Sequence, residues 1–459
     1  MRTAHTSSLR HHLVRMCLTL TLVLVAQAAI GLTMKEAVEL AMSNDPTFLA
    51  AQANLNVSRE RSKQAVAGLF PQITASANTT SNQRKYDLHS DPPPPNTPTE
   101  RYNSNSAQLN LTQPLWRHNS VIAMTQADLA VSQADFQLIA AAQELLVRLS
   151  QSWFDTMQAR DSVQAAAAQV RTARQQLDLS QRAHDKGILS LTDLEDARAK
   201  HEQALAEHAM AQSELEIRLA ALEQIIGPVQ LTPPMLSEQY PSPQMGAEPL
   251  EHWLAQAGTD NPALLAARRA LDAANEEVRK QKAGHEPTLD LVATYSNTAQ
   301  AAGITGREFG FDSRQSTIGL QLNMPLYAGG GQSAKVREAL ALKDKAMQEL
   351  EAARRQARMS VKEAWYTWRA GMVRETSARQ AMQSAELNRR GAQSARERGI
   401  KADIDVLQAE QQLAIAQRDW RKARYDIILS RIKLDAACGQ LDADRVVALD
   451  VAFSDRVEE

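Results

Sequence analysis

The residues best suited to chemistry are few and widely spaced in this 459-residue chain. His184, His201 and His208 fall within one stretch, but their spacing differs from the i, i+4 interval that places two imidazoles on one metal ion. The glycines at 329–331 lack the Lys-Ser/Thr of a phosphate-binding loop. No Ser–His–Asp set occurs in a suitable context. We therefore expect no enzyme, no cofactor and no metal site.

Charged residues gather around two glycines, Gly187 and Gly399. The first glycine lies within HDKGILSLTDLE and the second within RERGIKADIDVL. Each separates two segments rich in Ala, Gln, Glu and Arg, which are good helix formers. Charges beside a helix turn usually belong to a solvated surface. The pattern predicts two helical hairpins with tips near residues 187 and 399.

The composition narrows the class of protein. A net charge of −2 and the absence of a basic patch with interleaved aromatics give no footprint of nucleic-acid binding. Aromatic residues make up only 4% of the chain, whereas alanine and glutamine are abundant. This balance predicts thin helical layers instead of a thick globular core.

The N-terminus has the features of a signal peptide. Arginines precede an apolar run over residues 17–30, with small residues near its end. The run is shorter than the ~20 residues of a spanning helix, which disfavours a retained anchor. We expect a signal peptide over residues 1–28, with cleavage after Ala28 or, as second choice, after Gly31. The mature chain would keep one cysteine, Cys438, and so no intrachain disulfide.

The rest of the chain consists of two similar halves. Prolines and other marker residues recur at a nearly constant offset, a little less than half of the chain: Pro46 and Pro262, Pro71 and Pro287, Pro114 and Pro325, Trp153 and Trp365, Gly187 and Gly399, Gly227 and Gly439. We predict repeat 1 over 32–227, a linker over 228–249, repeat 2 over 250–439 and a tail over 440–459.

Each half contains a helix, two strands and a helical hairpin. Alternating apolar and polar residues predict strands at about 72–80, 106–114, 288–296 and 316–325. Polar loops join the strands of each pair, at 81–104 and 296–316. A proline-free segment from Val121 to Lys186 has heptad spacing, and predicts a helix roughly 100 Å long. The first helical segment, Thr33 to Ala67, and the return helix, Leu191 to Ile226, are each about half that length. Asn44, Asp45 and Pro46 form a helix-start signal inside the first segment.

Four short strands of this kind need partners. Their apolar face is too small for a core, and their edges would be exposed. A closed barrel satisfies every backbone group in a bilayer, and closure usually takes at least eight strands. Three chains would supply about twelve. A small soluble β-domain packed on the helices is the alternative.

The order of elements resembles the TolC family of outer-membrane efflux and type I secretion channels. The resemblance rests on Pro114-Leu115-Trp116, on PLYAGG from Pro325, and on the tip motifs GILSLTDLEDA and GIKADIDVLQA. It covers essentially the whole mature chain. It implies a mainly α protein with a membrane β-barrel: a homotrimer whose 12-stranded barrel, embedded in outer-membrane lipid, continues into a periplasmic α-helical barrel of coiled-coil hairpins.

The resemblance also implies partners and roles for the tip residues. The tips would engage a periplasmic adaptor (a membrane fusion protein) bound to an inner-membrane ABC or RND-type transporter. Thr192 and Asp193 match the acceptors of the links that close the channel. Lys401 matches an arginine donor, and Arg396 replaces a common tyrosine, where an Arg396–Asp193 ion pair could serve instead.

Other tip residues match the pore constriction and the docking surface. Asp405 matches the first carboxylate of an acidic ring, and Gln408 replaces the second. Adaptor docking would involve an apolar groove at the tips, formed by Gly187, Ile188, Leu189, Gly399 and Ile400.

The function expected is therefore an outer-membrane exit channel, localised in the outer membrane with a long periplasmic extension. The alternative is a soluble periplasmic coiled-coil adaptor or scaffold. The cargo, whether protein, drug, metal or another small molecule, stays open at this point.

Overall fold

The computed structural model describes residues 33–85, 99–228, 235–237, 240, 248–301 and 310–454. The expected signal peptide and most of the linker at 228–249 lie outside these residues. The chain divides into two compact units. The first unit combines Met1–Ala51, Ile139–Pro262 and Arg355–Glu459, and the second combines Gln52–Leu138 and Ala263–Arg354. None of the helices in the described part of the chain is both long and apolar enough to cross a membrane.

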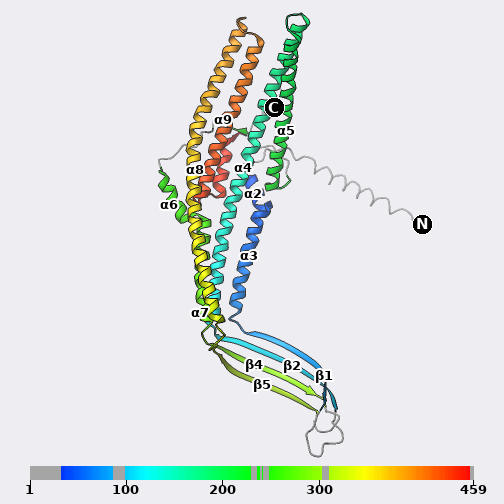
Figure 1. The fold of residues 1–459 in the computed structure, drawn as a ribbon, viewed down its shortest axis with the longest axis vertical. Helices are drawn as coiled ribbons and strands as arrows, with labels where there is room; N and C mark the ends of the chain where they lie inside the picture. Colours follow the sequence, from blue (N-terminus) through cyan, green and yellow to red (C-terminus); the bar gives the residue numbers. More distant parts are fainter. Residues whose placement is uncertain are drawn as a thin grey trace, which may run out of the picture. The chain divides into compact units, whose positions relative to one another are not determined.

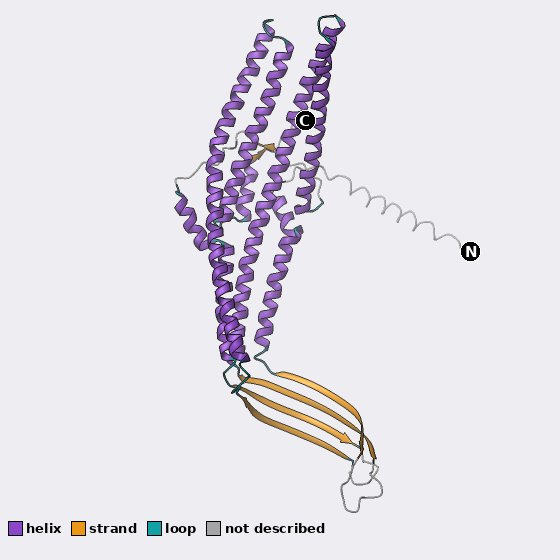
Figure 2. Ribbon diagram, viewed as in Figure 1, coloured by secondary structure: helices purple, strands orange, loops and turns teal. Residues whose placement is uncertain are grey.

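The elements follow the repeat (Figures 1 and 2). The first half contains α2 (Met34–Asn44), α3 (Pro46–Ala67), β1 (Gln72–Lys85), β2 (Thr99–Trp116), α4 (His118–Asp185) and α5 (Leu191–Ile226). After β3 (Met235–Leu236), the second half contains α6 (Leu250–Asp260), α7 (Pro262–Ala283), β4 (Thr288–Gln300), β5 (Phe311–Asn323), α8 (Gly331–Glu397) and α9 (Asp403–Ala437). The chain continues with α10 (Ala443–Val447), the 3-10 helix η1 (Ala448–Ala452) and β6 (Phe453–Ser454).

The strands differ from the predicted ranges. β1, β2 and β4 are longer than 72–80, 106–114 and 288–296, and β5 covers 311–323 instead of 316–325. Polar residues at 81–85 and 99–104, predicted to be loop, pair with each other, because the backbone ladder does not depend on apolar side chains. Pro114 does not end β2, which continues to Trp116 through an irregularity in its register with β4.

A buried aspartate stands between α2 and α3. Asp45 is 2% exposed, and its carboxylate accepts a hydrogen bond from the Phe48 N–H at 2.8 Å. Arg148 of α4 donates two further hydrogen bonds to it, at 3.1 and 3.2 Å. Pro46, which lacks an N–H, opens α3. The helix-start signal at Asn44, Asp45 and Pro46, inside the predicted helical segment from Thr33 to Ala67, is thus confirmed as the place where a second helix, α3, begins.

The same kind of break recurs between α6 and α7 at Asn261, whose side-chain amide donates to the Ala437 carbonyl at 2.9 Å. In the first half, Asn44 donates to the Ile226 carbonyl at 2.7 Å. Each break therefore lies against the end of a return helix, α5 or α9. Gly439 follows α9 at φ +79°, and a Cβ there would lie 2.2 Å from the Asp260 carbonyl oxygen.

One four-stranded antiparallel sheet has the order β1-β2-β4-β5. Its register places apolar side chains of all four strands in rows on one face. One row contains Ile73, Leu111, Ala293 and Ile318. The neighbouring residues form polar rows on the other face, such as Thr74, Asn110, Thr294 and Thr317. β1 and β5 are the sheet edges.

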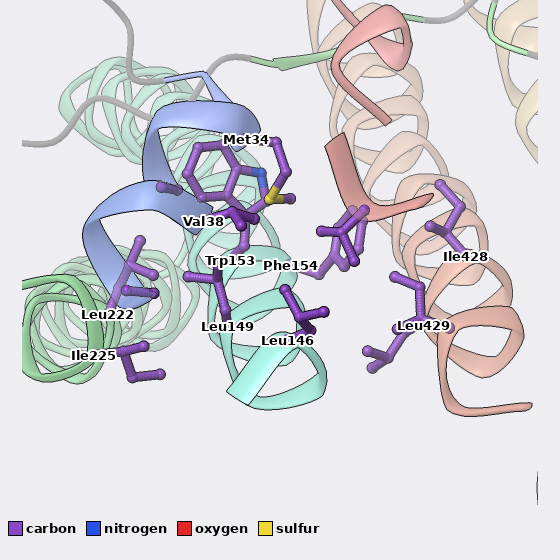
Figure 3. Close-up of a cluster of buried hydrophobic side chains, with 14 of the residues drawn as sticks. Met34, Val38, Leu146, Leu149, Trp153, Phe154, Leu222, Ile225, Ile428 and Leu429 are labelled. Atoms are coloured by element: carbon purple, nitrogen blue, oxygen red, sulfur yellow. The ribbon is translucent and has the colours of Figure 1, made fainter. Parts of the chain in front are cut away.

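The largest core of the first unit joins α2, α4, α5 and α9 (Figure 3). Trp153 of α4 is fully buried, with Leu146, Leu149 and Phe154 of the same helix beside it. Met34 and Val38 of α2 and Ile428 of α9 contribute from the other sides. Because helices distant in sequence meet here, burial of these side chains holds the two repeats together in this unit.

The C-terminal segment closes on the start of α2. The carboxylate of Asp450 in η1 accepts hydrogen bonds from the Met34 N–H at 2.6 Å and the Lys35 N–H at 3.0 Å. These two donors belong to the first turn of the helix, where no carbonyl of the helix can accept from them. The predicted tail at 440–459 thus contains ordered elements that pack on the first repeat.

Candidate functional site: the two hairpin tips

Both hairpin tips begin with the same turn. Gly187 has φ +69° and Gly399 has φ +70°, which favour glycine. The N–H of each glycine donates to the carbonyl three residues before it, at 2.8 Å. The next N–H, of Ile188 or Ile400, donates to the carbonyl five residues before it, at 2.9 and 2.8 Å. These are the two bonds of a Schellman motif, so each glycine ends a long helix in a defined turn.

The predicted docking residues lie on this turn. Ile188 and Ile400 are 77% and 73% exposed, an unusual position for isoleucine in a soluble protein. Leu189 is half-buried, and its carbonyl accepts a hydrogen bond from the Nδ1 of His184 at 3.0 Å. The structure thus presents one exposed isoleucine at each tip.

Asp193 lies in the first turn of α5. The Ser190 hydroxyl accepts a hydrogen bond from the Asp193 N–H at 3.2 Å and donates one to the Asp193 carboxylate at 2.7 Å. Thr192 is exposed beside it. A carboxylate in this position is favoured by the positive end of the helix dipole. Asp193 is therefore held in place and still accessible to a partner.

Asp405 occupies the equivalent position in α9, since it follows Gly399 by the same interval as Asp193 follows Gly187. Its carboxylate accepts a hydrogen bond from the Ala402 N–H at 2.9 Å. Gln408 is exposed one turn further along. Asp405 thus caps its own helix. This hydrogen bond engages only one of its carboxylate oxygens, so capping is compatible with the predicted role of Asp405 in the pore.

Arg396 forms an ion pair within its own tip, with Asp403. Within the described residues Arg396 thus pairs with Asp403, and the expected link between Arg396 and Asp193 stays a prediction. Arg396 and Asp403 are more than half exposed, so the pair contributes about 0–1 kcal/mol. Lys401 is exposed.

A polar cleft of about 620 Å³ separates the first hairpin from α9 near the tips. Asp193, Asp196 and Lys200 of α5 and Gln408 of α9 are among its lining residues. Of the predicted gate and pore residues, the structure therefore brings Asp193 and Gln408 to one cleft. The described residues include no group of three metal-ligating side chains.

A buried ionic cluster that sequence reasoning missed connects the two hairpins. Asp161 of α4 is 4% exposed and accepts hydrogen bonds from Arg421 at 3.0 Å and from the Tyr425 hydroxyl at 2.8 Å, both on α9. Burial raises the pKa of Asp161, although the Arg421 charge opposes it. Burial also raises the pKa of Tyr425. Asp161 lies between Phe154 and Ala165, two buried residues of a helix with heptad spacing. A carboxylate among such residues was the signal in the sequence that could have revealed this cluster.

A second missed residue is Arg424 of α9, which is 2% exposed. Its guanidinium donates to the carbonyls of Ser237 and Tyr240, at 2.9 and 2.6 Å, and lies over the Trp420 ring. It therefore fastens the segment between the repeats to α9. No sequence motif marks such a contact, because its acceptors are backbone atoms of an irregular segment.

The family described as "Outer membrane efflux protein" matches residues 37–228 and 253–440, which are the two repeats. The chain belongs to this family. It is an outer-membrane protein, and the predicted fold class of two repeats with long helical hairpins is confirmed.

Individual relatives are distant but match over nearly their full length. The chain is 27% identical to the outer membrane protein TolC of Vibrio cholerae, over 90% of this chain and 92% of the relative. It is 27% identical to the proteases secretion protein PrtF of Dickeya chrysanthemi, over 95% and 94%. The crystal structure of the outer membrane protein VceC from Vibrio cholerae aligns with a TM-score of 0.68 at 20% identity, covering 88% of this chain and 96% of that one. The family membership favours the channel over the soluble scaffold.

Proposed function

We propose that the protein is the exit channel of an efflux pump or type I secretion system, acting as a homotrimer. The observation that carries the proposal is the sheet: one apolar face, one polar face, and two unpaired edges. In a membrane the apolar face meets lipid and the polar face meets a water-filled lumen. Pairing β5 of each copy with β1 of the next closes a barrel, and three copies give twelve strands.

Aromatic side chains at the helix-side ends of the strands support this placement. Phe70, just before β1, is 60% exposed, Trp116 at the end of β2 is 59% exposed, and Tyr327, just after β5, is 88% exposed. Aromatic residues of this kind gather at membrane–water interfaces, because their rings are amphipathic. They would form the periplasmic girdle of the barrel.

The tips form the gate of the proposed channel and the docking surface for a periplasmic adaptor and its inner-membrane transporter. Exposed Asp193, Arg396 and Lys401 form weak links between hairpins of neighbouring copies, and threefold repetition lets several weak links bias opening. Ile188 and Ile400 supply apolar contacts for the adaptor. Relatives named for protease secretion and for efflux leave protein and small-molecule cargo as the two candidates.

The assembly test is fractionation and electrophoresis of the protein made in a Gram-negative host. We expect a detergent-requiring trimer in the outer-membrane fraction that dissociates on heating. A monomer released by osmotic shock would refute the proposal.

The pore test is the conductance of the purified trimer in a planar bilayer. Asp405→Ala should lower cation selectivity, whereas Asp419→Ala, an exposed acid further along α9, should leave it unchanged. The ring holds one acid per chain, so divalent cations should block the channel only weakly. Unchanged ion selectivity in Asp405→Ala would remove Asp405 from the bore.

A further inference from the structure

Within the first unit, the four hairpin helices form a row with two outer members. Gln169 of α4 donates to Glu207 of α5 at 2.7 Å, and Tyr425 of α9 donates to Asp161 of α4. Trp420 of α9 donates to Glu375 of α8 at 3.0 Å. The order is therefore α5, α4, α9, α8, and Figure 1 shows α5 and α8 on opposite sides. Among the four hairpin helices, each outer helix therefore has a neighbour on one side only, although α2 also packs on α5 and Trp253 of α6 also packs on α8.

The outer face of α8 carries an apolar stripe. The residues of α8 that pack on α9 include Val361 and Trp368, one heptad apart, and Ala385 at the other core position of the same heptad repeat. Four large side chains lie on the face of α8 opposite to these packing residues, at intervals of one or two heptads. They occupy the heptad position that a two-helix coiled coil leaves exposed to solvent. They are Met359, Tyr366, Val373 and Leu387, exposed by 58%, 55%, 68% and 68%.

The outer face of α5 is complementary to this stripe in shape. At the corresponding heptad position it carries small residues: Ala199, Ala206, Ser213 and Ala220. All four are exposed, and the large side chains of Met210 and Ile217 stand beside them, 64% and 60% exposed.

The heights of the two faces also agree. Leu387 precedes the Gly399 tip by the same interval as Ala199 follows the Gly187 tip. Val373 and Ser213 are likewise equally far from their tips along the chain. The two hairpins are level, because the hydrogen-bonded residues Asp161 and Tyr425 are also equally far from the tip glycines of their own hairpins.

The charges of the two outer helices are opposite as well. From Arg355 to the end of α8 there are nine Lys or Arg and four Asp or Glu, a net charge of +5. α5 contains three Lys or Arg and eight Asp or Glu, a net charge of −5. Complementary charge of this size favours pairing of unlike faces and opposes pairing of two α8 faces or two α5 faces.

We propose that the α8 stripe packs against the small-residue face of α5 in the next copy of the chain, with Val373 level with Ser213 and Leu387 level with Ala199. This inference rests on the proposed trimer and specifies its helical seam. The seam is heterologous, because it joins two different faces of the chain. Every copy therefore has both faces covered only when the copies form a closed ring. In a symmetric ring all copies lie at the same level along the symmetry axis, so the residues of α8 stay level with the α5 residues of the next copy.

Site-specific crosslinking of the full chain in outer membranes tests the seam. Val373→Cys combined with Ser213→Cys should yield covalent dimers and trimers with a short bis-maleimide. Each single-cysteine variant should stay monomeric on a denaturing gel, which also controls for Cys438. Combining Val373→Cys with Ala199→Cys, two heptads out of register, should crosslink at least about tenfold less, because the sites lie roughly 20 Å apart along the helix.

Two further measurements keep the result interpretable. Val373→Glu should reduce the trimer fraction about tenfold or more, because a carboxylate would be buried against an acidic helix, whereas Ala381→Glu, exposed on another side of α8, should not. Val373→Cys should resist a soluble maleimide in the trimer. Intact trimers in which Val373→Cys is fully labelled, or in which the paired cysteines do not crosslink, would overturn the seam and leave the channel proposal standing. Absence of trimers in the unmodified protein would refute the channel proposal itself.

Discussion

Replacing Arg421 by methionine tests whether the buried cluster on α4 and α9 holds the two hairpins together. The substitution keeps most of the side-chain volume and leaves the Asp161 carboxylate, 4% exposed, with the Tyr425 hydroxyl and the more distant charge of Arg160. Removing one partner of a buried ion pair costs about 3–5 kcal/mol, because the remaining charge stays desolvated. Removing an exposed pair costs about 0–1 kcal/mol. Arg418→Met, which breaks the exposed pair of Arg418 with Asp419, is therefore the matched control.

The assay is chemical denaturation of the detergent-solubilised protein, followed by circular dichroism, beside single-channel recording. We expect Arg421→Met to lower the free energy of unfolding per chain far more than Arg418→Met, and to increase spontaneous opening because the link between α4 and α9 is weakened. Adding Asp161→Leu to Arg421→Met should recover much of the loss, since no buried charge then remains. Equal effects of Arg421→Met and Arg418→Met, or strictly additive effects in the double variant, would refute this reasoning.

Two other predictions concern the helix breaks. Gly439→Ala should destabilise the protein by about 2–5 kcal/mol in the same denaturation assay, because the new Cβ would lie 2.2 Å from the Asp260 carbonyl oxygen and φ is +79°. The control is Gly187→Ala, which should cost only about 1–2 kcal/mol because no atom lies within 4 Å of the new Cβ. Equal losses of stability in the two variants would contradict the packing argument. Burial would raise the pKa of Asp45, but hydrogen bonds from Arg148 and the Phe48 N–H outweigh it and lower the pKa below 3.8. The stabilisation that the ionised Asp45 carboxylate gives is therefore present above pH 3.8 and is lost as the pH falls through the lower pKa of the folded state. Asp45→Asn should flatten the pH dependence of the free energy of unfolding below about pH 4 and leave that dependence unchanged at neutral and mildly acidic pH.

The long elements could be predicted from the sequence because their signals are local. The predicted return helix Leu191–Ile226 agrees with α5, and the predicted helix Val121–Lys186 differs from α4 by three residues at one end and one at the other. Heptad spacing and the glycine stops determine both. The predicted lengths of the strands were wrong, because segments such as 81–85 are polar on both faces of the sheet. Such segments lack the alternation of apolar and polar residues from which a strand is predicted.

The contacts between repeats could not be predicted in the same way. Asp161 and Tyr425 are 264 residues apart, and their contact depends on which faces of α4 and α9 meet. The ion pair of Arg396 with Asp403 was missed for a different reason. The close approach of these two side chains depends on the detailed geometry of the turn after Gly399, which the residue types alone do not determine.

The contact of Asp450 with the first turn of α2 has a consequence for the order of assembly. The acceptor for the N–H groups of this turn lies 416 residues further along the chain, so it is synthesised and exported well after α2. A chain still in transit therefore leaves the Met34 and Lys35 N–H groups without this acceptor, and the first repeat completes its packing only when the C-terminal segment arrives. Fusions or truncations that displace Asp450 would weaken the start of α2, 416 residues away in sequence from the position that was altered.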